Sequence, residues 1–538
     1  MANGSSPAQV FAATARRCPD RPFALAPASA RLPWAPDGFH IPYAEAADRV
    51  DALRAAYVAA GYGRGSRVAL LLQNRPEMLL HWMALNGIGA SIVPLNGDMR
   101  PDELLHQMVV SEAKTVIAAP GFTSLLTTGL PSDVAMAELD FPPPPARTPC
   151  KPGDGQPSDE AALLFTSGST GKPKACVLSN AYFLHLADWY VSMDGVGAMR
   201  PDGEVALTPL PFFHMNALGC TALGMIRIGG AIVPLDRFHP DRWWATIADS
   251  GATVVHALGV IPAIVLQRPP SPDDRRHRAR FVFAPGVDAA QREAFEARYG
   301  VTVVDGWAMT ETGGTGMTDT SGLAAIPAGR CIGRPRAGMA WRIVDEAGHD
   351  VPPGAAGELL VRSTGPDPRH GFFSGYLGED AATEAAWAGG FFHTGDVMRA
   401  DAGGLLYFVD RRKSIIRRSG ENISALEVET ALLADPAVRS AAVTPVADAL
   451  REEEVFAFVV LRGDARPEAI LDRLAQRLSY HKLPGWMMVT EDLPVSSTQK
   501  LQRGAVRTLA EAAVAEGRAS DLRRTKGSLR TAFAKEMP

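Results

Sequence analysis

The sequence predicts an α/β protein with a large N-terminal domain of layered α/β subdomains plus a β-rich subdomain, and a small C-terminal α+β domain. The chain has 538 residues, more than one hydrophobic core normally serves. From Arg67 onward, short apolar runs alternate with stretches of helical spacing, which is typical of layered α/β proteins. Beyond Lys413 this pattern changes, and enough strand and helix signal follows for a second compact domain.

The first half of the chain supplies most of the layered elements. A proline-rich connector is expected over 140–159, because proline cannot sit in the centre of a sheet. Strand and helix signals resume at 161 and continue to about 345. Before the connector we expect a helix over Pro76 to Asn86 and strands at VALLL (68–72), ASIVPL (90–95) and KTVIAA (114–119).

The second half predicts hairpins and then a helix with a defined start. Ser424 and Glu427 have the spacing of a capping box that opens an amphipathic helix. We expect hairpins at GHDVPPGAAGELLVR (348–362) and GGLLYFVDRR (403–412), and strands at RSAAVTPV (439–446) and VFAFVVL (455–461). The predicted domains are 1–412 and 413–520, followed by a basic, loosely ordered tail over 521–538.

Composition and charge exclude several classes of protein. The chain is 46% hydrophobic and 21% charged, and its formal net charge of −5 argues against a nucleic-acid binder. No apolar run approaches the length of a membrane span, and the N-terminus lacks the features of a signal peptide. The five cysteines are scattered and never form a C-x-x-C pair, so we expect a reduced, cytoplasmic protein. Whether it forms a homodimer stays open.

The segment LLFTSGSTGKPKACVLSN (163–180) predicts a phosphate-binding loop. Ala161 to Phe165 read as a buried strand, and the following glycines and hydroxyls can present hydrogen-bond donors to phosphate. It is not a Walker A loop, because only two residues separate Gly168 from Gly171. A flexible loop with solvated lysines is the alternative. The candidate nucleotide-binding residues here are Thr166, Ser167, Gly168, Ser169, Thr170, Gly171, Lys172 and Lys174.

Three further strings carry charged or hydroxyl groups suited to a nucleotide. VDGWAMTETGG (304–314) places Thr310 and Glu311 beside a glycine-rich turn, where they could hold Mg²⁺ and a phosphate oxygen. Asp396 could accept both hydroxyls of a ribose, and Arg411 could pair with phosphate or ribose oxygens. PVSSTQKLQR (494–503) places Lys500 in a polar loop.

These strings together resemble the adenylate-forming superfamily of acyl-CoA synthetases, adenylation domains and luciferases. The resemblance covers nearly the whole chain and rests on seven motifs in the family's order, and it is greatest to ligases of the crotonobetaine/carnitine-CoA type. The motifs are TSGSTGKPK, GWAMTE, GRP (333–335), GEL (357–359), HTGD, DRRKSIIRRSGEN and TQK.

The resemblance implies a role for each matching residue. Thr166 to Lys174 would wrap the ATP phosphates, Lys500 would bridge the substrate carboxylate and the α-phosphate, and Lys413 would be the hinge of a mobile C-terminal domain. Glu311 would hold Mg²⁺, with Thr310 at the α-phosphate. The remaining assignments are the adenine and ribose contacts Pro285, Gly286, Asp305, Gly306, Trp307, Asp396 and Arg411, the coenzyme A loop Ser419, Gly420, Glu421 and Asn422, and His214 near the acyl and thiol path.

The implied activity is that of an ATP-dependent acyl-CoA ligase. A carboxylate is a poor electrophile, so it first attacks ATP to give an acyl-AMP and pyrophosphate, and a thiolate then displaces AMP. The cosubstrates and cofactors would be ATP, Mg²⁺ and coenzyme A. The two steps require Lys500 in and then out of the site, which explains a rotating domain. The motifs do not identify the carboxylic acid substrate, for which we expect a small to medium or ring-bearing acid.

Some residues depart from the family pattern, and three other readings stay open. Ala175, Asn180, Ala308 and Gln499 replace common family residues, and FAPGVD (283–288) matches the adenine-binding turn only loosely. Without the resemblance, we would interpret His214 and Trp307 as core residues. Lys413 and Lys500 would then be surface lysines. We expect Trp243 and Trp244 to fill core. The chain could instead load a carrier protein, act as a luciferase-like oxygenase, or serve as a nucleotide sensor.

Overall fold

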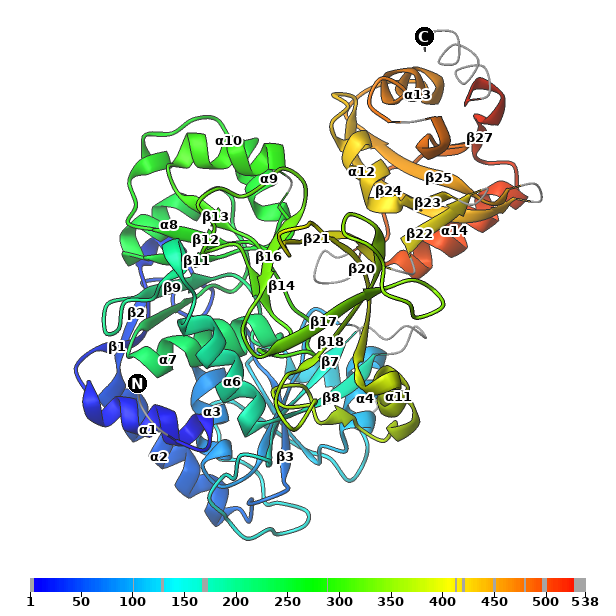
Figure 1. Cartoon of the computed structure of the whole chain (residues 1–538). Helices are drawn as coiled ribbons and strands as arrows, with labels where there is room; N and C mark the ends of the chain where they lie inside the picture. Colours follow the sequence, from blue (N-terminus) through cyan, green and yellow to red (C-terminus); the bar gives the residue numbers. More distant parts are fainter. Residues whose placement is uncertain are drawn as a thin grey trace. The chain divides into compact units, whose positions relative to one another are not determined.

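The chain divides into two compact units. The computed structural model describes residues 4–99, 101–126, 130–166, 173–287, 289–411, 414–418, 421–448, 451–478, 480–495 and 501–526. The first unit comprises residues 1–342, 360–394 and 400–407, and the second comprises 343–359, 395–399 and 408–538. Each unit is described below by itself (Figure 1).

One sheet of the first unit is almost entirely parallel and has helices over a buried core. Only its last pair, β1 and β2, is antiparallel. Trp243 and Trp244 lie in this core, as expected. The helices that pack there are α8 (Trp243–Ser250), α9 (Val260–Leu266) and α10 (Ala289–Tyr299). The strand order is β13 (Thr302–Val304), β12 (Phe281–Phe283), β11 (Val254–His256), β9 (Val205–Thr208), β10 (Ala231–Pro234), β1 (Pro22–Ala26) and β2 (Phe39–Pro42).

A second sheet of this unit carries the hairpin from which the predicted phosphate loop extends. Its strand order is β19 (Gly375–Tyr376), β8 (Lys174–Ser179), β7 (Glu160–Thr166), β4 (Ser91–Pro94), β3 (Arg67–Leu71), β5 (Thr115–Ala118) and β6 (Ala135–Glu138). The pairs β19–β8 and β8–β7 are antiparallel, and the others are parallel. Strands β4, β3 and β5 confirm the strands predicted at 90–95, 68–72 and 114–119. Short apolar runs of this kind are typical of parallel strands that are buried on both faces.

A layer of helices in the first unit includes the predicted helix over Pro76 to Asn86. Helix α1 packs against α2, α3, α6 and α7. Ser6 caps α1, and its hydroxyl accepts from the Gln9 N–H. The bounds of these elements are α1 (Pro7–Arg17), α2 (Tyr43–Ala59), α3 (Pro76–Asn86), α6 (Asn180–Val191), a π-helix (Asn216–Leu223) and α7 (Gly224–Ile228). The other helices of this unit are α4 (Pro101–Ser111), α5 (Thr123–Leu126), α11 (Asp380–Ala386) and the short 3₁₀ turns η1 (Ala28–Ala30), η2 (Gly195–Gly197), η4 (Pro272–Arg275) and η5 (Ala388–Gly390).

The β-rich region predicted after residue 345 forms a third sheet, whose strands the unit boundary divides. The hairpins expected there are present as strands separated by turns, because Gly and Pro clusters interrupt alternating apolar residues. The strand order is β14 (Gly306–Trp307), β15 (Thr318–Asp319), β16 (Cys331–Pro335), β21 (Leu406–Arg411), β20 (Phe392–Ala400), β18 (Ala356–Ser363) and β17 (Met339–Val344).

The second unit contains an α+β fold around a mostly antiparallel sheet. The hydroxyl of Ser424 accepts from the Glu427 N–H at 3.1 Å, so the predicted start of α12 is confirmed. Separate apolar cores cover the sheet, one with α12 and α13 and one with α14. The elements are β22 (Ile415–Arg418), β23 (Glu421–Ser424), α12 (Ala425–Leu433), β24 (Val438–Asp448), β25 (Glu452–Leu461), α13 (Pro467–Leu474), η7 (Tyr480–Lys482), β26 (Trp486–Val489), α14 (Arg503–Ala515) and β27 (Ser520–Asp521).

The beginning of the predicted tail is part of the fold. Strand β27 pairs with β26, Leu522 lies in the core, and Lys526 is 1% exposed. The expectation of a loosely ordered segment is therefore wrong for Asp521 to Lys526, and residues 527–538 lie outside the described part of the chain. The basic composition of this segment predicted exposure to solvent, but Lys526 pairs with the buried carboxylate of Glu454.

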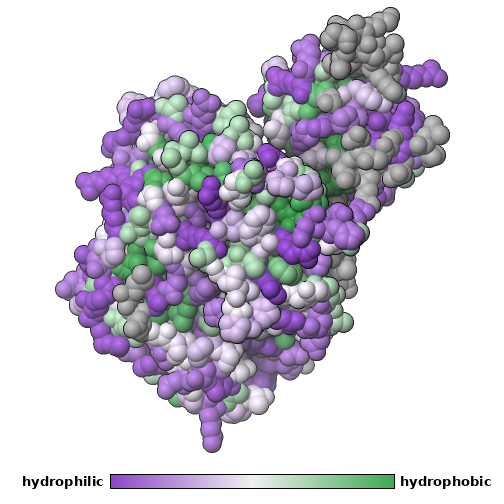
Figure 2. All heavy atoms as spheres, in the orientation of Figure 1, coloured by the Kyte–Doolittle hydropathy of each residue, from purple (hydrophilic) through white to green (hydrophobic). Residues whose placement is uncertain are grey.

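The surface is a mosaic of hydrophilic and hydrophobic side chains. On the face shown in Figure 2, hydrophilic residues cover most of the area and hydrophobic ones appear in smaller patches. Among the described residues, no helix combines the length and the apolar composition needed to cross a bilayer. All five cysteines are free thiols.

Candidate active site

The predicted phosphate loop begins and ends on a two-stranded base. Thr166 at the end of β7 pairs with Lys174 at the start of β8, and Phe165 pairs with Ala175. The loop residues between them, Ser167, Gly168, Ser169, Thr170, Gly171 and Lys172, lie outside the described residues, so their role stays a prediction. The base nevertheless fixes where the loop leaves the sheet.

The structure brings the predicted metal carboxylate to this base. Oε1 of Glu311 lies 3.5 Å from Oγ1 of Thr166, although 145 positions separate these residues in the sequence. The hydroxyl of Tyr376 donates to the same Glu311 oxygen at 3.0 Å. Glu311 is only 6% exposed. Two hydroxyls thus surround one buried carboxylate at the edge of the phosphate loop.

Tyr376 joins the carboxylate to the lysine of the loop base. Nζ of Lys174 lies 4.8 Å from the centre of the Tyr376 ring and forms an ion pair of 2.7 Å with Glu379. Burial and, after it, the neighbouring Glu311 hold the pKa of the Tyr376 phenol well above its usual value. The phenol therefore remains a hydrogen-bond donor to Glu311 at neutral pH.

Sequence reasoning did not identify Tyr376 or Glu379. Tyr376 lies on β19, where it pairs with Cys176 on the outer strand of the hairpin. Its partner Glu311 is 65 positions earlier, and no local pattern connects the two. The only local pattern near these residues is Gly375–Tyr376 followed by the acidic start of a helix at Asp380. By itself this pattern predicts a turn and not a functional site.

The backbone that carries Thr310 and Glu311 is held on both sides. The Tyr182 hydroxyl donates to the carbonyl oxygen of Thr310 at 2.8 Å, and the Phe373 N–H donates to that of Glu311 at 3.0 Å. Tyr182 is positioned by helix α6, whose cap Ser179 accepts from the Tyr182 N–H. Ser179 ends β8, so the same hairpin that supports the loop also positions this contact.

Asp305 connects two glycine turns that the sequence assigned to the adenine. Its Oδ1 accepts from the N–H of Gly286 at 3.0 Å and from that of Gly306 at 2.7 Å. Burial raises the pKa of Asp305 to about 6, although these two N–H donors oppose the shift. The predicted residues Pro285, Gly286, Asp305 and Gly306 are thereby brought together.

Glycine is required at both of these turns. Gly286 has φ +85°, a conformation that side-chain-bearing residues rarely adopt. A Cβ on Gly306 would lie 2.8 Å from the carbonyl oxygen of Thr318. The neighbouring Trp307 lies on β14, pairs with Thr318 and is 7% exposed. Its large ring is therefore almost fully enclosed.

His214 packs beside an aromatic side chain. It precedes the π-helix, and its ring centre is 4.7 Å from that of Phe213. Further along, Asn216 Oδ1 lies 2.8 Å from Nδ1 of His256, whose Nε2 contacts the Tyr190 hydroxyl. Burial lowers the pKa of His256 to about 3, so this imidazole is neutral.

The second unit contains the predicted ribose residues. Nε of Arg411 lies 3.4 Å from Oδ1 of Asp396, which is 3% exposed. The backbone of Glu421 and Asn422 belongs to β23, where they pair with Arg418 and Arg417. The predicted hinge Lys413, the loop residues Ser419 and Gly420, and the predicted catalytic Lys500 lie outside the described residues.

The residues around Glu311 fit a magnesium ion held mainly by a substrate. A buried carboxylate with two neighbouring hydroxyl oxygens is a set of hard donors, as Mg²⁺ prefers. Within the described ranges, no group of three or more His, Cys, Asp or Glu side chains could hold a metal ion. One carboxylate completed by phosphate oxygens is a usual arrangement for Mg²⁺.

Comparisons with known proteins identify the family of the chain. The family described as AMP-binding enzyme matches residues 11–377, and its C-terminal domain matches 427–500. The crotonobetaine/carnitine–CoA ligase of Citrobacter koseri is 29% identical over 484 residues, which are 85% of this chain and 91% of that protein.

Solved structures show the same fold. The crystal structure of ATP-bound MatB from Rhodopseudomonas palustris is 25% identical, has a TM-score of 0.78, and covers 94% of this chain and 99% of its own. The anthranilate CoA ligase AuaEII in complex with anthranoyl-AMP is 21% identical with a TM-score of 0.81, covering 95% and 98%. The predicted fold class is thus confirmed, and the chain belongs to the AMP-binding enzyme family.

Proposed function

We propose that this chain activates a carboxylic acid with ATP to an acyl-AMP, with release of pyrophosphate, and then transfers the acyl group to the thiol of coenzyme A, with release of AMP. The chain is an AMP-forming acid–thiol ligase. Its family and its similarity to named CoA ligases support this chemistry. ATP is the substrate of the first step and coenzyme A that of the second.

One structural observation gives the main support for this proposal. The hydroxyl of Thr166, at the base of a hydroxyl- and glycine-rich loop, lies 3.5 Å from the buried Glu311 carboxylate. A loop suited to phosphates therefore begins next to a carboxylate suited to a divalent cation. A nucleoside triphosphate with its bound metal ion requires both groups close together.

In the first unit, the loop from Thr166 to Lys174 would bind the β- and γ-phosphates. Thr310 and Glu311 would sit at the α-phosphate. Mg²⁺ at Glu311 would neutralise charge on the phosphate oxygens. Tyr376 orients the Glu311 carboxylate through its hydroxyl and covers Lys174 with its ring. The turns joined by Asp305 would border the adenine.

In the second unit, Asp396 would accept the ribose hydroxyls, with Arg411 beside it. Lys500 would neutralise the charge that develops when the acid attacks the α-phosphorus, which is the usual origin of large catalytic effects. Rotation about Lys413 would then remove Lys500 and bring Gly420, Glu421 and Asn422 to the thiol. His214 would lie near the acyl and thiol path.

The acid is proposed only by size class, as a small to medium or ring-bearing carboxylic acid. Free coenzyme A is preferred to a carrier protein as acceptor because the relatives compared above are CoA ligases. A cytoplasmic location, the 413–520 boundaries of the mobile domain and a homodimer all stay predictions.

The test is product detection by mass spectrometry. The protein is incubated with ATP, Mg²⁺ and a panel of small, branched, acyclic and aromatic carboxylic acids, with and without coenzyme A. Acyl-AMP without the thiol and acyl-CoA with it are expected for at least one acid. Acyl-AMP that is never passed to coenzyme A would favour a carrier-protein acceptor, and no activation of any acid would favour a nucleotide sensor.

A further inference from the structure

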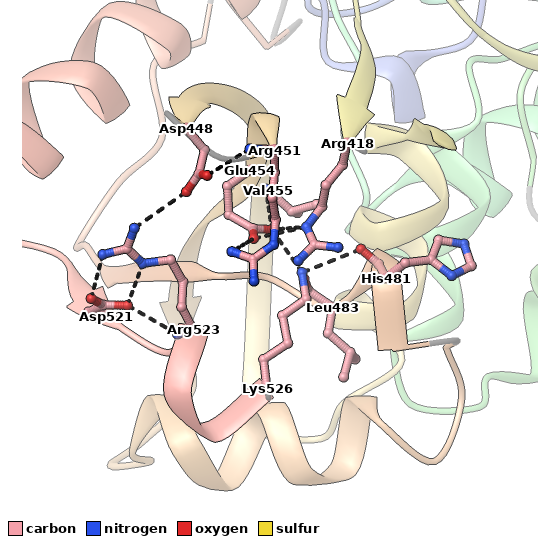
Figure 3. Close-up of polar contacts among 10 residues, drawn as sticks. All are labelled: Arg418, Asp448, Arg451, Glu454, Val455, His481, Leu483, Asp521, Arg523 and Lys526. Atoms are coloured by element: carbon pink, nitrogen blue, oxygen red, sulfur yellow. Dashed lines mark hydrogen bonds and ion pairs between the residues drawn. The ribbon is translucent and has the colours of Figure 1, made fainter. Parts of the chain in front are cut away.

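A buried cluster of charges in the second unit is not used by the reaction described above. Glu454 on β25 is fully buried, and Arg418 and Lys526 beside it are 3% and 1% exposed. The three residues come from segments that are far apart in the sequence (Figure 3). Buried ions need paired, hydrogen-bonded partners, so this cluster is a specific arrangement and not a solvated surface.

Lys526 uses all of its donors inside the protein. Its Nζ donates to Oε1 of Glu454 at 2.8 Å, to the carbonyl oxygen of His481 at 3.3 Å and to that of Leu483. An ammonium group has three N–H donors, so the set is complete. Burial lowers the pKa of Lys526 to about 8 even with Glu454 adjacent. Lys526 therefore ties the chain's last described residues to β25 and to the turn before β26.

Arg418 completes the cluster from the opposite side. Its Nε lies 2.9 Å from both carboxylate oxygens of Glu454. Gly485 permits this packing, because a Cβ there would lie 2.4 Å from Cγ of Glu454. Oε1 of Glu454 also accepts from the Val455 N–H. Both carboxylate oxygens are thus occupied, and the side chain has little room to move.

Arg418 lies at the end of a hairpin that matters to the proposed reaction. It is the last residue of β22 and pairs with Glu421, the first residue of β23. Ser419 and Gly420 between them, Glu421 itself and the next residue Asn422 are those assigned to coenzyme A. The position of Arg418 therefore sets where β22 ends, directly before that segment.

A buried ion cluster is a poor way to gain stability, because apolar residues of similar volume often stabilise a fold as well or better. In several proteins, buried charged groups instead fix a single defined geometry. We propose that Lys526 is a positioning residue for the thioester-forming step: together with Arg418 it holds Glu454, and so fixes the end of β22, directly before the segment assigned to coenzyme A. This inference rests on the proposed function.

The test compares the two half-reactions in variants of Lys526. Lys526→Met removes the charge and the donors, while Lys526→Gln keeps a donor of shorter reach. Arg524→Met is the matched control, since Arg524 is an exposed cation two positions earlier. Adenylation is measured as acid-dependent pyrophosphate release, with hydroxylamine as acceptor in place of coenzyme A. Thioester formation is measured from supplied acyl-AMP over a range of coenzyme A concentrations.

We expect Lys526→Met to slow thioester formation by about tenfold or more, the scale on which a small misplacement acts, and to raise the KM for coenzyme A. Its adenylation should change less than about twofold, a change too small to reflect loss of positioning. Lys526→Gln should be intermediate, and Arg524→Met should match the wild type. Faster amide hydrogen exchange over 415–424 in Lys526→Met gives a readout independent of activity.

Other outcomes would overturn the inference. Equal losses in both half-reactions, unchanged rates in both, or failure of both Lys526 variants to fold would make Lys526 a residue of general stability. A wild-type protein that forms acyl-AMP but no thioester would instead overturn the proposed function. The two failures are therefore distinguishable in one set of assays.

Discussion

Thr166 Oγ1 and Glu311 Oε1 are 3.5 Å apart, and this contact joins two motifs that are 145 positions apart in the sequence. Thr166 is placed by its pairing with Lys174 across the β7–β8 hairpin. Glu311 is placed by the hydrogen bonds of its own and the preceding carbonyl. The hairpin and the turn therefore define one point in the first unit at which phosphate and metal would meet.

Glu311→Gln should slow adenylation by about 10² to 10³-fold, the usual loss when one preorganised electrostatic contact is removed. Glutamine can still accept from Tyr376, so the change removes charge more than packing. The rate of pyrophosphate release should be measured against Mg²⁺ concentration, with Glu384→Gln, whose carboxylate pairs with Arg369, as the carboxylate control. A variant with the Mg²⁺ dependence of the wild type would contradict the metal assignment.

Tyr376→Phe separates the hydroxyl from the ring. The lost hydrogen bond to the Glu311 carboxylate is worth about 1.5 kcal/mol, so adenylation should fall about tenfold. Tyr376→Leu also removes the ring over Lys174 and should lose about threefold more. Tyr407→Phe, which removes a hydroxyl bonded to Asp401 elsewhere, is the control. Equal rates for Tyr376→Phe and the wild type would show that the hydroxyl does not orient Glu311.

Lys500→Ala should abolish most acyl-AMP formation and spare thioester formation from supplied acyl-AMP, because the proposed bridge acts only while the α-phosphorus is attacked. Lys482→Ala, which removes a lysine paired with Glu427 in the same unit, should leave both steps intact. Single-turnover assays of each step check this. Similar losses in the two steps of Lys500→Ala would contradict the assigned role.

The elements that the sequence predicted well depend on local signals. Helix α3 has the bounds expected from its spacing, and Ser424 caps α12 because a capping box needs only residues three positions apart. The fold class followed from the alternation of such elements. The motifs that identified the family are likewise short, continuous strings.

The contacts that sequence reasoning missed are between distant residues. Tyr376 reaches Glu311 across 65 positions, and Lys526 reaches Glu454 across 72. A basic composition predicts exposure on average, and nothing near Lys526 in the sequence indicates a buried carboxylate. Such pairs are set by the packing of strands β8 and β25, which a single sequence does not specify.

Asp305→Asn should change how stability depends on pH. Burial raises the pKa of Asp305 to about 6 in the folded protein from an ordinary 3.8. A raised pKa means that the folded state prefers the protonated form. Its contribution to stability is therefore fully present below about pH 4 and is lost as pH rises through about 6. The difference between the two values corresponds to at most about 3 kcal/mol.

Asparagine resembles the protonated acid, and its Oδ1 can still accept from the N–H groups of Gly286 and Gly306. The thermal midpoint of Asp305→Asn relative to wild type should therefore be higher at pH 7 than at pH 4.5. Asp401→Asn is the control, because backbone donors led by the Leu405 N–H lower the pKa of Asp401, so that its contribution to stability is already present at both pH values. Its midpoint relative to wild type should therefore stay nearly constant between the same two pH values. If the difference in thermal midpoint between Asp305→Asn and the wild type does not vary with pH, the pKa of this carboxyl is not raised in the folded protein. The two glycine turns would then be held together equally well by the ionised and the protonated carboxyl.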